Sequence, residues 1–272
     1  MAIIHNEGDC LRTVIVCPPG EEYFHAHDLN ALGMNAAPDR EQTNSQFERL
    51  VKEMERSGSE LLTIDELDGH PNSVFTRDVA LCSPLGYIQL RMGLPSRKGE
   101  PQWMSEALDS IGVTRAGQIV EPGTVEGGDI ILAGDVAFIG HSNRTNREGI
   151  SQIRKILEYQ GYEIRIQKVP EDSLHLGGVM SIIAPRRVVY REDTFPAGFF
   201  KGFDTVTIPK ECLSSGNVIC LGANEVIANS AENQTGINIL EDSGVKVHAL
   251  DLSEFRKGGG GPTCLILPVE RE

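Results

Sequence analysis

Pairs of short apolar strands recur along the chain, and a tight turn joins the two strands of each pair. Four such hairpins are predicted, at Val79–Leu90, Asp129–Gly140, Val179–Tyr190 and Asn217–Asn229. Their starting positions are regularly spaced, at residues 79, 129, 179 and 217. This regularity indicates a repeated supersecondary unit rather than unrelated hairpins.

A helix and one further strand are predicted after each hairpin. The first two helices carry apolar residues at helical spacing, namely Met104, Ala107, Leu108 and Ile111 in one and Ile150, Ile153 and Leu157 in the other. Weaker patterns predict a third helix around Ala197–Phe203 and a fourth over Glu232–Asp242. The strands predicted to follow are Gln118–Glu121, Glu163–Val169, Asp204–Ile208 and Val245–Leu250.

A fifth unit is predicted to join the two ends of the chain. Thr263–Pro268 can pair with Thr13–Cys17, and a helix and a strand then follow. The helix carries Phe47, Leu50, Val51 and Met54 in register, and the strand is Leu61–Ile64. Five units that close through both termini favour a closed radial α/β arrangement over an open α+β sheet with ordinary hairpins.

Composition indicates a soluble globular protein of 272 residues, with 40% hydrophobic and 24% charged residues. The chain has 25 Lys and Arg residues against 39 Asp and Glu residues, a net charge of −14, which argues against nucleic-acid or anionic-membrane binding. The acidic excess would suit a small cationic substrate, although a solvated acidic surface is the commoner explanation. The absence of a long apolar run, of a secretory signal pattern and of paired cysteines leads us to expect a cytoplasmic protein without disulfides.

Four chemically reactive residues occupy equivalent places, because each belongs to a segment that precedes or opens a predicted hairpin or the terminal strand. They are Asp78, Glu126, His175 and Cys264, the last of which follows the glycine run that begins at Gly258. If rotation relates the units, these residues converge on one central pit. A zinc site is the competing interpretation, but Cys264 has no nearby Cys or His partner, so we expect no metal and no cofactor.

Two carboxylates beside a thiol favour a particular electrophile. They oppose thiolate formation, yet they match the N–H donors of a planar guanidinium. A bound guanidinium would offset the local negative charge. The sequence therefore predicts that Asp78 and Glu126 hold a guanidinium while Cys264 attacks its carbon, with His175 as general acid and base.

The same segments resemble the guanidino-group-modifying enzymes, a superfamily of dimethylarginine dimethylaminohydrolases, arginine deiminases and amidinotransferases. The resemblance covers essentially the whole chain and rests on Phe75-Thr-Arg-Asp78, Glu126-Gly-Gly-Asp129, Arg144-Thr-Asn146, Leu174-His-Leu176 and the glycine-rich approach to Cys264. It implies a five-bladed α/β propeller, the pentein fold, of pseudo-fivefold ββαβ repeats around a central active-site pit. It also implies a covalent thiouronium intermediate on Cys264.

The resemblance further implies which residues bind the substrate. Arg91 and Arg144 would hold an α-carboxylate, and Asn72 and Leu32 are expected to contact the substrate as well. The irregular segment Tyr23–Pro38 would form a lid over the pit. We expect one catalytic domain over residues 1–272, and the exposed edges of a propeller are compatible with a homodimer.

Within the superfamily the chain combines features of two groups. Its length suits the short dimethylarginine dimethylaminohydrolases, and Gly177 stands where arginine deiminases usually carry an aspartate. However, Asn72 and Arg77 resemble arginine deiminase, since dimethylarginine dimethylaminohydrolases tend to carry acids there. Arginine, methylated arginine or another guanidine therefore remain candidate substrates. Amidino transfer, dihydrolase chemistry beyond citrulline and a non-catalytic binding propeller stay as alternatives.

Overall fold

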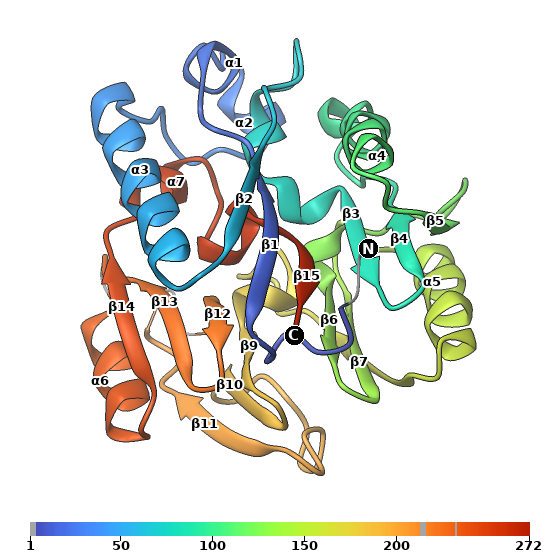
Figure 1. Ribbon diagram of the computed structural model, residues 1–272, viewed down its shortest axis with the longest axis vertical. Coiled ribbons are helices and arrows are strands. Elements are labelled where there is room, and N and C mark those ends of the chain that lie inside the picture. The colour runs from blue at the N-terminus through green and yellow to red at the C-terminus, as the bar shows by residue number, and fades with distance from the viewer. Residues whose placement is uncertain (1–3, 213–215, 232) are drawn as a thin grey trace.

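The computed structural model describes residues 4–212, 216–231 and 233–272. Within these ranges the strands form five three-stranded sheets arranged around a centre (Figure 1). In sheet order the strands are β15 (Leu267–Arg271), β1 (Leu11–Val16) and β2 (Glu60–Thr63); β3 (Ala80–Ser83), β4 (Gly86–Gln89) and β5 (Arg115–Gln118); β6 (Ile130–Ala133), β7 (Val136–His141) and β8 (Glu163–Lys168); β9 (Met180–Ala184), β10 (Arg187–Arg191) and β11 (Asp204–Ile208); and β12 (Val218–Gly222), β13 (Glu225–Asn229) and β14 (Lys246–Leu250).

Every sheet has the same internal pattern. The middle strand pairs antiparallel with one neighbour, as in a hairpin, and parallel with the other. Parallel pairing requires a crossover connection between the two strands. In four sheets that crossover contains a helix, namely α3 (Arg40–Arg56), α4 (Glu100–Ser110), α5 (Arg147–Tyr159) and α6 (Gln234–Asp242). The repeated unit and the five-bladed α/β propeller are thereby confirmed.

Helix α5 shows how local sequence builds such a crossover. Asn146 caps the helix by accepting a hydrogen bond from the Gly149 N–H at 2.8 Å. Ile150, Ile153 and Leu157 then form its buried stripe against the sheet. Shorter helices lie in the connections, namely α1 (Glu21–Phe24), α2 (Leu29–Leu32) and α7 (Ser253–Lys257).

The two ends of the chain close the first blade, as predicted. β1 and β15 lie side by side near the centre of the view, with Leu11 opposite Arg271 and Ile15 opposite Leu267 (Figure 1). The predicted start of the terminal strand at Thr263 was wrong, because Pro262–Leu265 forms a 3₁₀ turn before β15 begins. That turn carries Cys264.

Two further predictions of elements need correction. The strand predicted at Gln118–Glu121 lies earlier, at Arg115–Gln118, because β4 ends at Gln89 and Gln89 pairs with Gln118. The helix predicted around Ala197–Phe203 is a series of turns. There Phe199, Phe200 and Phe203 pack around the ring of Phe138, and these aromatic contacts take the place of a helical stripe. Glu232, the first residue predicted for the fourth helix, lies outside the described residues.

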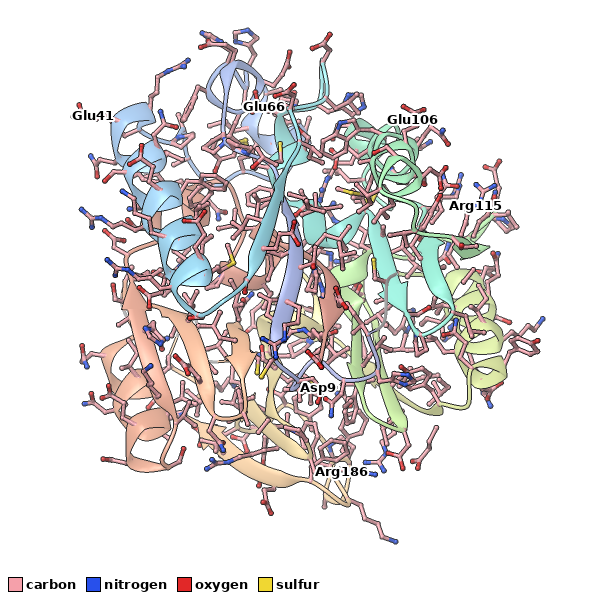
Figure 2. All side chains as sticks on the ribbon, in the orientation of Figure 1. Asp9, Glu41, Glu66, Glu106, Arg115 and Arg186 are labelled. Atoms are coloured by element: carbon pink, nitrogen blue, oxygen red, sulfur yellow. The ribbon has the colours of Figure 1, made fainter. Side chains whose placement is uncertain are left out.

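The apolar strands are buried between the helices and the centre, and many charged side chains lie at the surface. Glu41, Glu106 and Arg115 are exposed, and they lie at the rim of the molecule (Figure 2). These exposed side chains agree with the expectation that part of the charge of the chain lies on a solvated surface. In the described part of the chain, no helix has both the length and the apolar character needed to cross a membrane.

Candidate active site

The four predicted reactive residues lie at the same position of four different blades. Asp78 ends a 3₁₀ turn before β3, Glu126 precedes the turn before β6, His175 precedes the turn before β9, and Cys264 lies in the turn before β15. These turns contact one another around the centre of the propeller. The convergence that the repeat predicted is therefore present.

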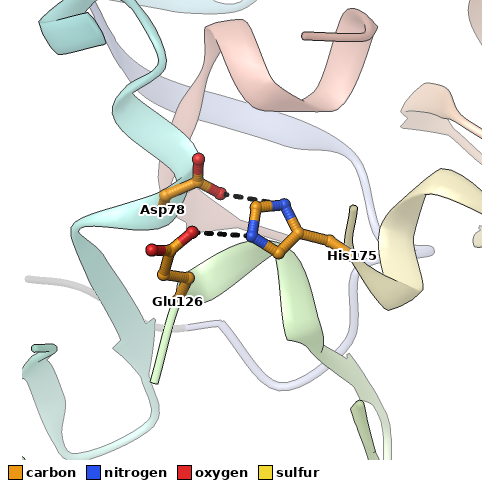
Figure 3. Close-up of side chains that lie close together, drawn as sticks. All are labelled: Asp78, Glu126 and His175. Carbon is orange, nitrogen blue, oxygen red and sulfur yellow. Dashed lines mark hydrogen bonds and ion pairs between the residues drawn. The ribbon is translucent and has the colours of Figure 1, made fainter. Parts of the chain in front are cut away.

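His175 lies between the two carboxylates (Figure 3). Its Nε2 is 2.8 Å from Oε2 of Glu126, and its Nδ1 is 3.7 Å from Oδ1 of Asp78. All three side chains are buried. Cys264 is partly buried, lines the same cavity as His175, and is one of the groups that raise the pKa of that histidine. The thiol, the imidazole and the two carboxylates are thus gathered at the centre of the propeller.

A glycine makes this close approach sterically allowed. A Cβ atom at Gly128 would lie 2.7 Å from Nδ1 of His175 and 2.9 Å from Oδ1 of Asp78. Any side chain there would separate the two residues. The Gly128 N–H instead donates a hydrogen bond to Oδ1 of Asp78 at 3.2 Å. The Glu126-Gly-Gly segment therefore shapes the site through its backbone.

A buried arginine that the sequence did not single out is paired with Asp78. Arg97 Nη1 lies 2.7 Å from Oδ2 of Asp78, and its Nη2 lies 2.6 Å from Oε2 of Glu100. Burial lowers the pKa of Arg97, but the charges of Glu100 and Asp78 outweigh it, so the net direction is upward. In sequence, Arg97 and Glu100 have only the i,i+3 spacing of an ordinary surface pair.

The charge state of the central pair follows from its surroundings. Burial alone would lower the pKa of His175, but Asp78, Cys264 and Glu126 raise it well above 6.5. Burial would raise the pKa of Glu126, yet its hydrogen bond to His175 and that cation's charge lower it to about 2. Near neutral pH the pair is an imidazolium and a carboxylate.

This pair predicts how stability and activity depend on pH. His175 stabilises the fold fully below its ordinary pKa of 6.5 and loses that contribution as pH rises through its raised pKa. Glu126 contributes stability above its ordinary pKa of 4.5 and loses that contribution as pH falls through about 2.

With protonated His175 as the acid, we expect kcat/KM to fall on the alkaline side. Glu126→Gln removes one anion and should shift that fall to lower pH. An NMR titration of His175 alongside the kinetics tests this, and an unchanged alkaline limb would contradict it.

A small cavity beside residues 32 and 33 collects most of the predicted binding residues. This inner cavity is lined by Leu32, Gly33, Asn72, Phe75, Asp78, Arg97, Arg144, Leu174, Gly258, Gly259, Gly260 and Cys264. Asn72 donates from Nδ2 to the Leu32 carbonyl at 2.8 Å, while its buried Oδ1 has no partner among the described residues. Arg144 Nη1 lies 3.5 Å from Oε1 of Glu126.

Arg91 is the predicted site residue that the structure does not bring to this group. Its side chain contacts Glu121 at 3.2 Å and the Gly123 carbonyl at 3.1 Å. Among the described residues that line the cavities around Cys264, Arg91 does not occur, whereas Arg97 does. The reason is that Arg91 forms a β-bridge with Val125, which directs it toward the loop at 121–123.

Asp78, Glu126 and His175 also place donor atoms within 4.8 Å of one another, a spacing that could hold a metal ion. However, His175 bonds to Glu126 and Arg97 already pairs with Asp78. A cation would have to displace both partners. We therefore expect exhaustive chelation to leave activity unchanged, measured against enzyme dialysed without chelator; loss that added metal restores would contradict this.

Comparisons with known proteins agree with this geometry. The family model described as N,N dimethylarginine dimethylhydrolase, eukaryotic, matches residues 26–271. The N(G),N(G)-dimethylarginine dimethylaminohydrolase of Pseudomonas aeruginosa is 30% identical over 233 residues, which cover 85% of this chain and 89% of the relative. The corresponding enzyme of Streptomyces coelicolor is 30% identical over 222 residues, covering 81% and 83%.

Solved structures show the same fold. A mutant of the Pseudomonas aeruginosa enzyme complexed with citrulline has a TM-score of 0.81 and 27% identity, and the match covers 95% of this chain and 99% of that one. The amidinotransferase SxtG of Microseira wollei has a TM-score of 0.83 at 18% identity, covering 100% and 97%, and shows the likeness of fold alone. The chain belongs to the dimethylarginine dimethylaminohydrolase family of the guanidino-group-modifying enzymes and is a cysteine-dependent hydrolase of guanidino C–N bonds.

Proposed function

We propose that the enzyme hydrolyses arginine or an N-methylated arginine to citrulline, with release of ammonia or an amine. The observation that carries this proposal is the thiol of Cys264 in one cavity wall with His175, whose imidazole contacts two buried carboxylates. The names of the relatives, and the citrulline complex of one of them, support the same substrate class.

In this proposal the substrate's guanidinium binds at Asp78 and Glu126. Its amino-acid end points into the inner cavity, where the Arg144 guanidinium faces the α-carboxylate. The unpartnered Oδ1 of Asn72 accepts a hydrogen bond from the α-ammonium, and Leu32 covers the chain. Arg97 takes the place that the sequence suggested for Arg91 in lining this cavity.

The reaction then proceeds in two balanced steps. The bound guanidinium offsets the local negative charge, and the Cys264 thiol releases its proton to solvent. The thiolate Sγ then forms a bond to the guanidine carbon, and the C–N bond to the departing nitrogen breaks as His175 gives that nitrogen its proton. The product is a thiouronium on Cys264. His175, now neutral, removes one proton from water, whose oxygen bonds to the same carbon; the C–S bond breaks, and the leaving sulfur takes the second proton to restore the thiol. One water is consumed, and citrulline and an amine leave.

Residues 23–38 act as a lid of a single catalytic domain in this proposal. The inner cavity leaves only about 20 Å³ of free space, too little for an amino acid, so Leu32 and Gly33 must move to admit the substrate. The far end of the lid is held to α7, where the N–H groups of Asn35 and Ala36 donate to the Lys257 carbonyl at 2.6 and 3.1 Å.

Arg144 and Arg91 form a matched pair for testing the binding of the carboxylate. Arg144→Ala should raise KM for the amino-acid substrate by about 10- to 100-fold, because a charge-assisted hydrogen bond is lost. Its effect should vanish with agmatine, which has no carboxylate. Arg91→Ala should change KM less than about twofold, since the interaction it loses is an exposed pair. Equal effects of the two substitutions would overturn the assignment.

The overall reaction is tested by product analysis. Purified enzyme is incubated with arginine and, separately, with asymmetric dimethylarginine, and citrulline, ammonia and dimethylamine are quantified. Formation of citrulline with equimolar ammonia or dimethylamine supports the proposal and identifies the substrate. If neither guanidine is consumed, the proposal fails. An added amine that takes up the amidino group in place of water would reassign the enzyme as a transferase.

We further propose a cytoplasmic homodimer. All six cysteines are free thiols, which suits a reducing compartment. Tyr159 on α5 is 85% exposed and Ile166 on the edge strand β8 is 43% exposed, so this blade offers apolar side chains to a second copy. Light scattering should give twice the chain mass of 29.7 kDa, and a monomer at all concentrations would contradict this part.

A further inference from the structure

Cys264 lies on the boundary between two cavities. Asp78 lines the inner cavity, whereas His175 lines a second cavity of about 550 Å³. Leu174, Gly259, Gly260 and Cys264 line both. The group that receives a proton from His175 therefore leaves on the side of the second cavity.

Part of the wall of the second cavity is formed by glycine residues. Gly177, Gly178 and the run Gly259–Gly261 line it, and they contribute backbone but no side chain. A Cβ atom placed at Gly178 would meet no non-neighbouring atom within 4 Å among the described residues. This wall therefore leaves room that a side chain would otherwise fill.

The remaining lining favours a neutral occupant. Asp172 is paired with Arg191 at 2.9 Å, and Lys257 is paired with Glu254 at 2.7 Å. Arg256, which also lines this cavity, likewise has an interaction partner. Neutral polar groups make up much of the rest, namely those of Asn35, Ser173, Asn217, Ser253 and Thr263. A charged occupant would compete with pairs that already exist, whereas a neutral chain would not.

The volume exceeds what the departing amine of a methylated arginine needs. At about 30 Å³ for each heavy atom, the share of one water in the liquid, dimethylamine fills about 90 Å³. The cavity of about 550 Å³ lies in the range typical of small-molecule sites. An amine of about eight heavy atoms would fill about 240 Å³ on the same measure and would still fit.

We propose that the second cavity receives the departing nitrogen together with its substituent, so that the enzyme hydrolyses Nω-substituted arginines whose leaving amine is larger than dimethylamine. The substituent is a neutral alkyl or hydroxyalkyl chain. This rests on the function proposed above and uses the same balanced reaction: one water is consumed, and the substituted nitrogen leaves as the amine while citrulline is formed.

The test compares Nω-methyl-, Nω-butyl- and Nω-hexylarginine on the purified enzyme, with citrulline and the free amine quantified. We expect kcat/KM for the butyl compound to lie within about tenfold of that for the methyl compound, with butylamine as product. If the methyl compound is hydrolysed and the butyl compound is not, this inference is overturned and the proposed function stands. Release of ammonia together with Nω-butylcitrulline would also overturn this inference, because the substituted nitrogen would then stay on the product and would not leave into the second cavity.

A second experiment narrows the second cavity by substitution. Gly178→Leu should lower kcat/KM for butylarginine by about tenfold or more and leave methylarginine within about threefold. Ala231→Phe fills the same cavity from another blade and replaces Gly178→Leu if that variant folds poorly. It should also lower kcat/KM more for butylarginine than for methylarginine. Equal losses for both substrates in both variants would show that the cavity does not hold the substituent. If no guanidine is consumed by the unmodified enzyme, the proposed function itself fails.

Discussion

Cys264→Ser is expected to lower citrulline formation by about 10⁴-fold or more. A serine hydroxyl ionises far less readily than a thiol and is a much weaker nucleophile toward a guanidine carbon. The variant should fold normally, because the exchange replaces only one atom in a partly buried turn. Its unfolding temperature should match that of the unmodified protein, and substrate binding should persist.

Cys10→Ser is the matched control for this substitution. Cys10 is also a partly buried free thiol, but it lies near Gly222 and away from His175. We expect it to retain full activity. Mass spectrometry of acid-quenched enzyme should find a covalent adduct on the unmodified protein and none on Cys264→Ser. Activity in Cys264→Ser within tenfold of the unmodified enzyme would contradict a nucleophilic role.

His175→Ala is expected to lower kcat by about 10²- to 10⁴-fold, the range for loss of a general acid and base. The same change leaves Asp78 and Glu126 buried without the cation between them. Breaking such a buried pair typically costs about 3–5 kcal/mol, so the free energy of unfolding should fall as well. Kinetics and thermal unfolding measure the two effects separately.

A catalytic role for His175 is distinguished from a structural one by chemical rescue. Added imidazole should restore part of kcat in His175→Ala, because it can carry the proton in the vacated space. The restored rate should depend on the pH of the solution, which sets the fraction of imidazole that is protonated. His25→Ala serves as the control, since the side chain of that histidine is 64% exposed and its ion pair is with Glu21. Loss of stability with kcat unchanged would leave His175 a purely structural residue.

Much of the fold was predictable because its pattern is local. A hairpin and a helical stripe each depend on residues close in sequence, as the Asn146 cap and the Ile150–Leu157 stripe of α5 illustrate. The prediction failed where contacts from elsewhere decide the conformation. Phe199 and Phe200 form turns because Phe138, more than fifty residues away, supplies their packing surface.

The site was predictable to the extent that the repeat places its residues. Asp78, Glu126, His175 and Cys264 precede equivalent strands, so rotational symmetry brings them together without any knowledge of side-chain contacts. Arg97 has no such position in the repeat, and its role depends on its burial against Asp78 and Glu100. Arg91 lies at the end of an apolar strand and looked equally suitable in sequence.

The sequence by itself determined the five units, their closure through both termini and the four reactive residues, since periodicity and repeat position are properties of the chain. Only the tertiary structure decided that Arg97 rather than Arg91 lines the inner cavity, and that the pKa of His175 is raised. It also decided that Cys264 lies between this small cavity and a larger one of about 550 Å³. Those features depend on distances and burial between blades, and such distances are set when the five sheets pack together.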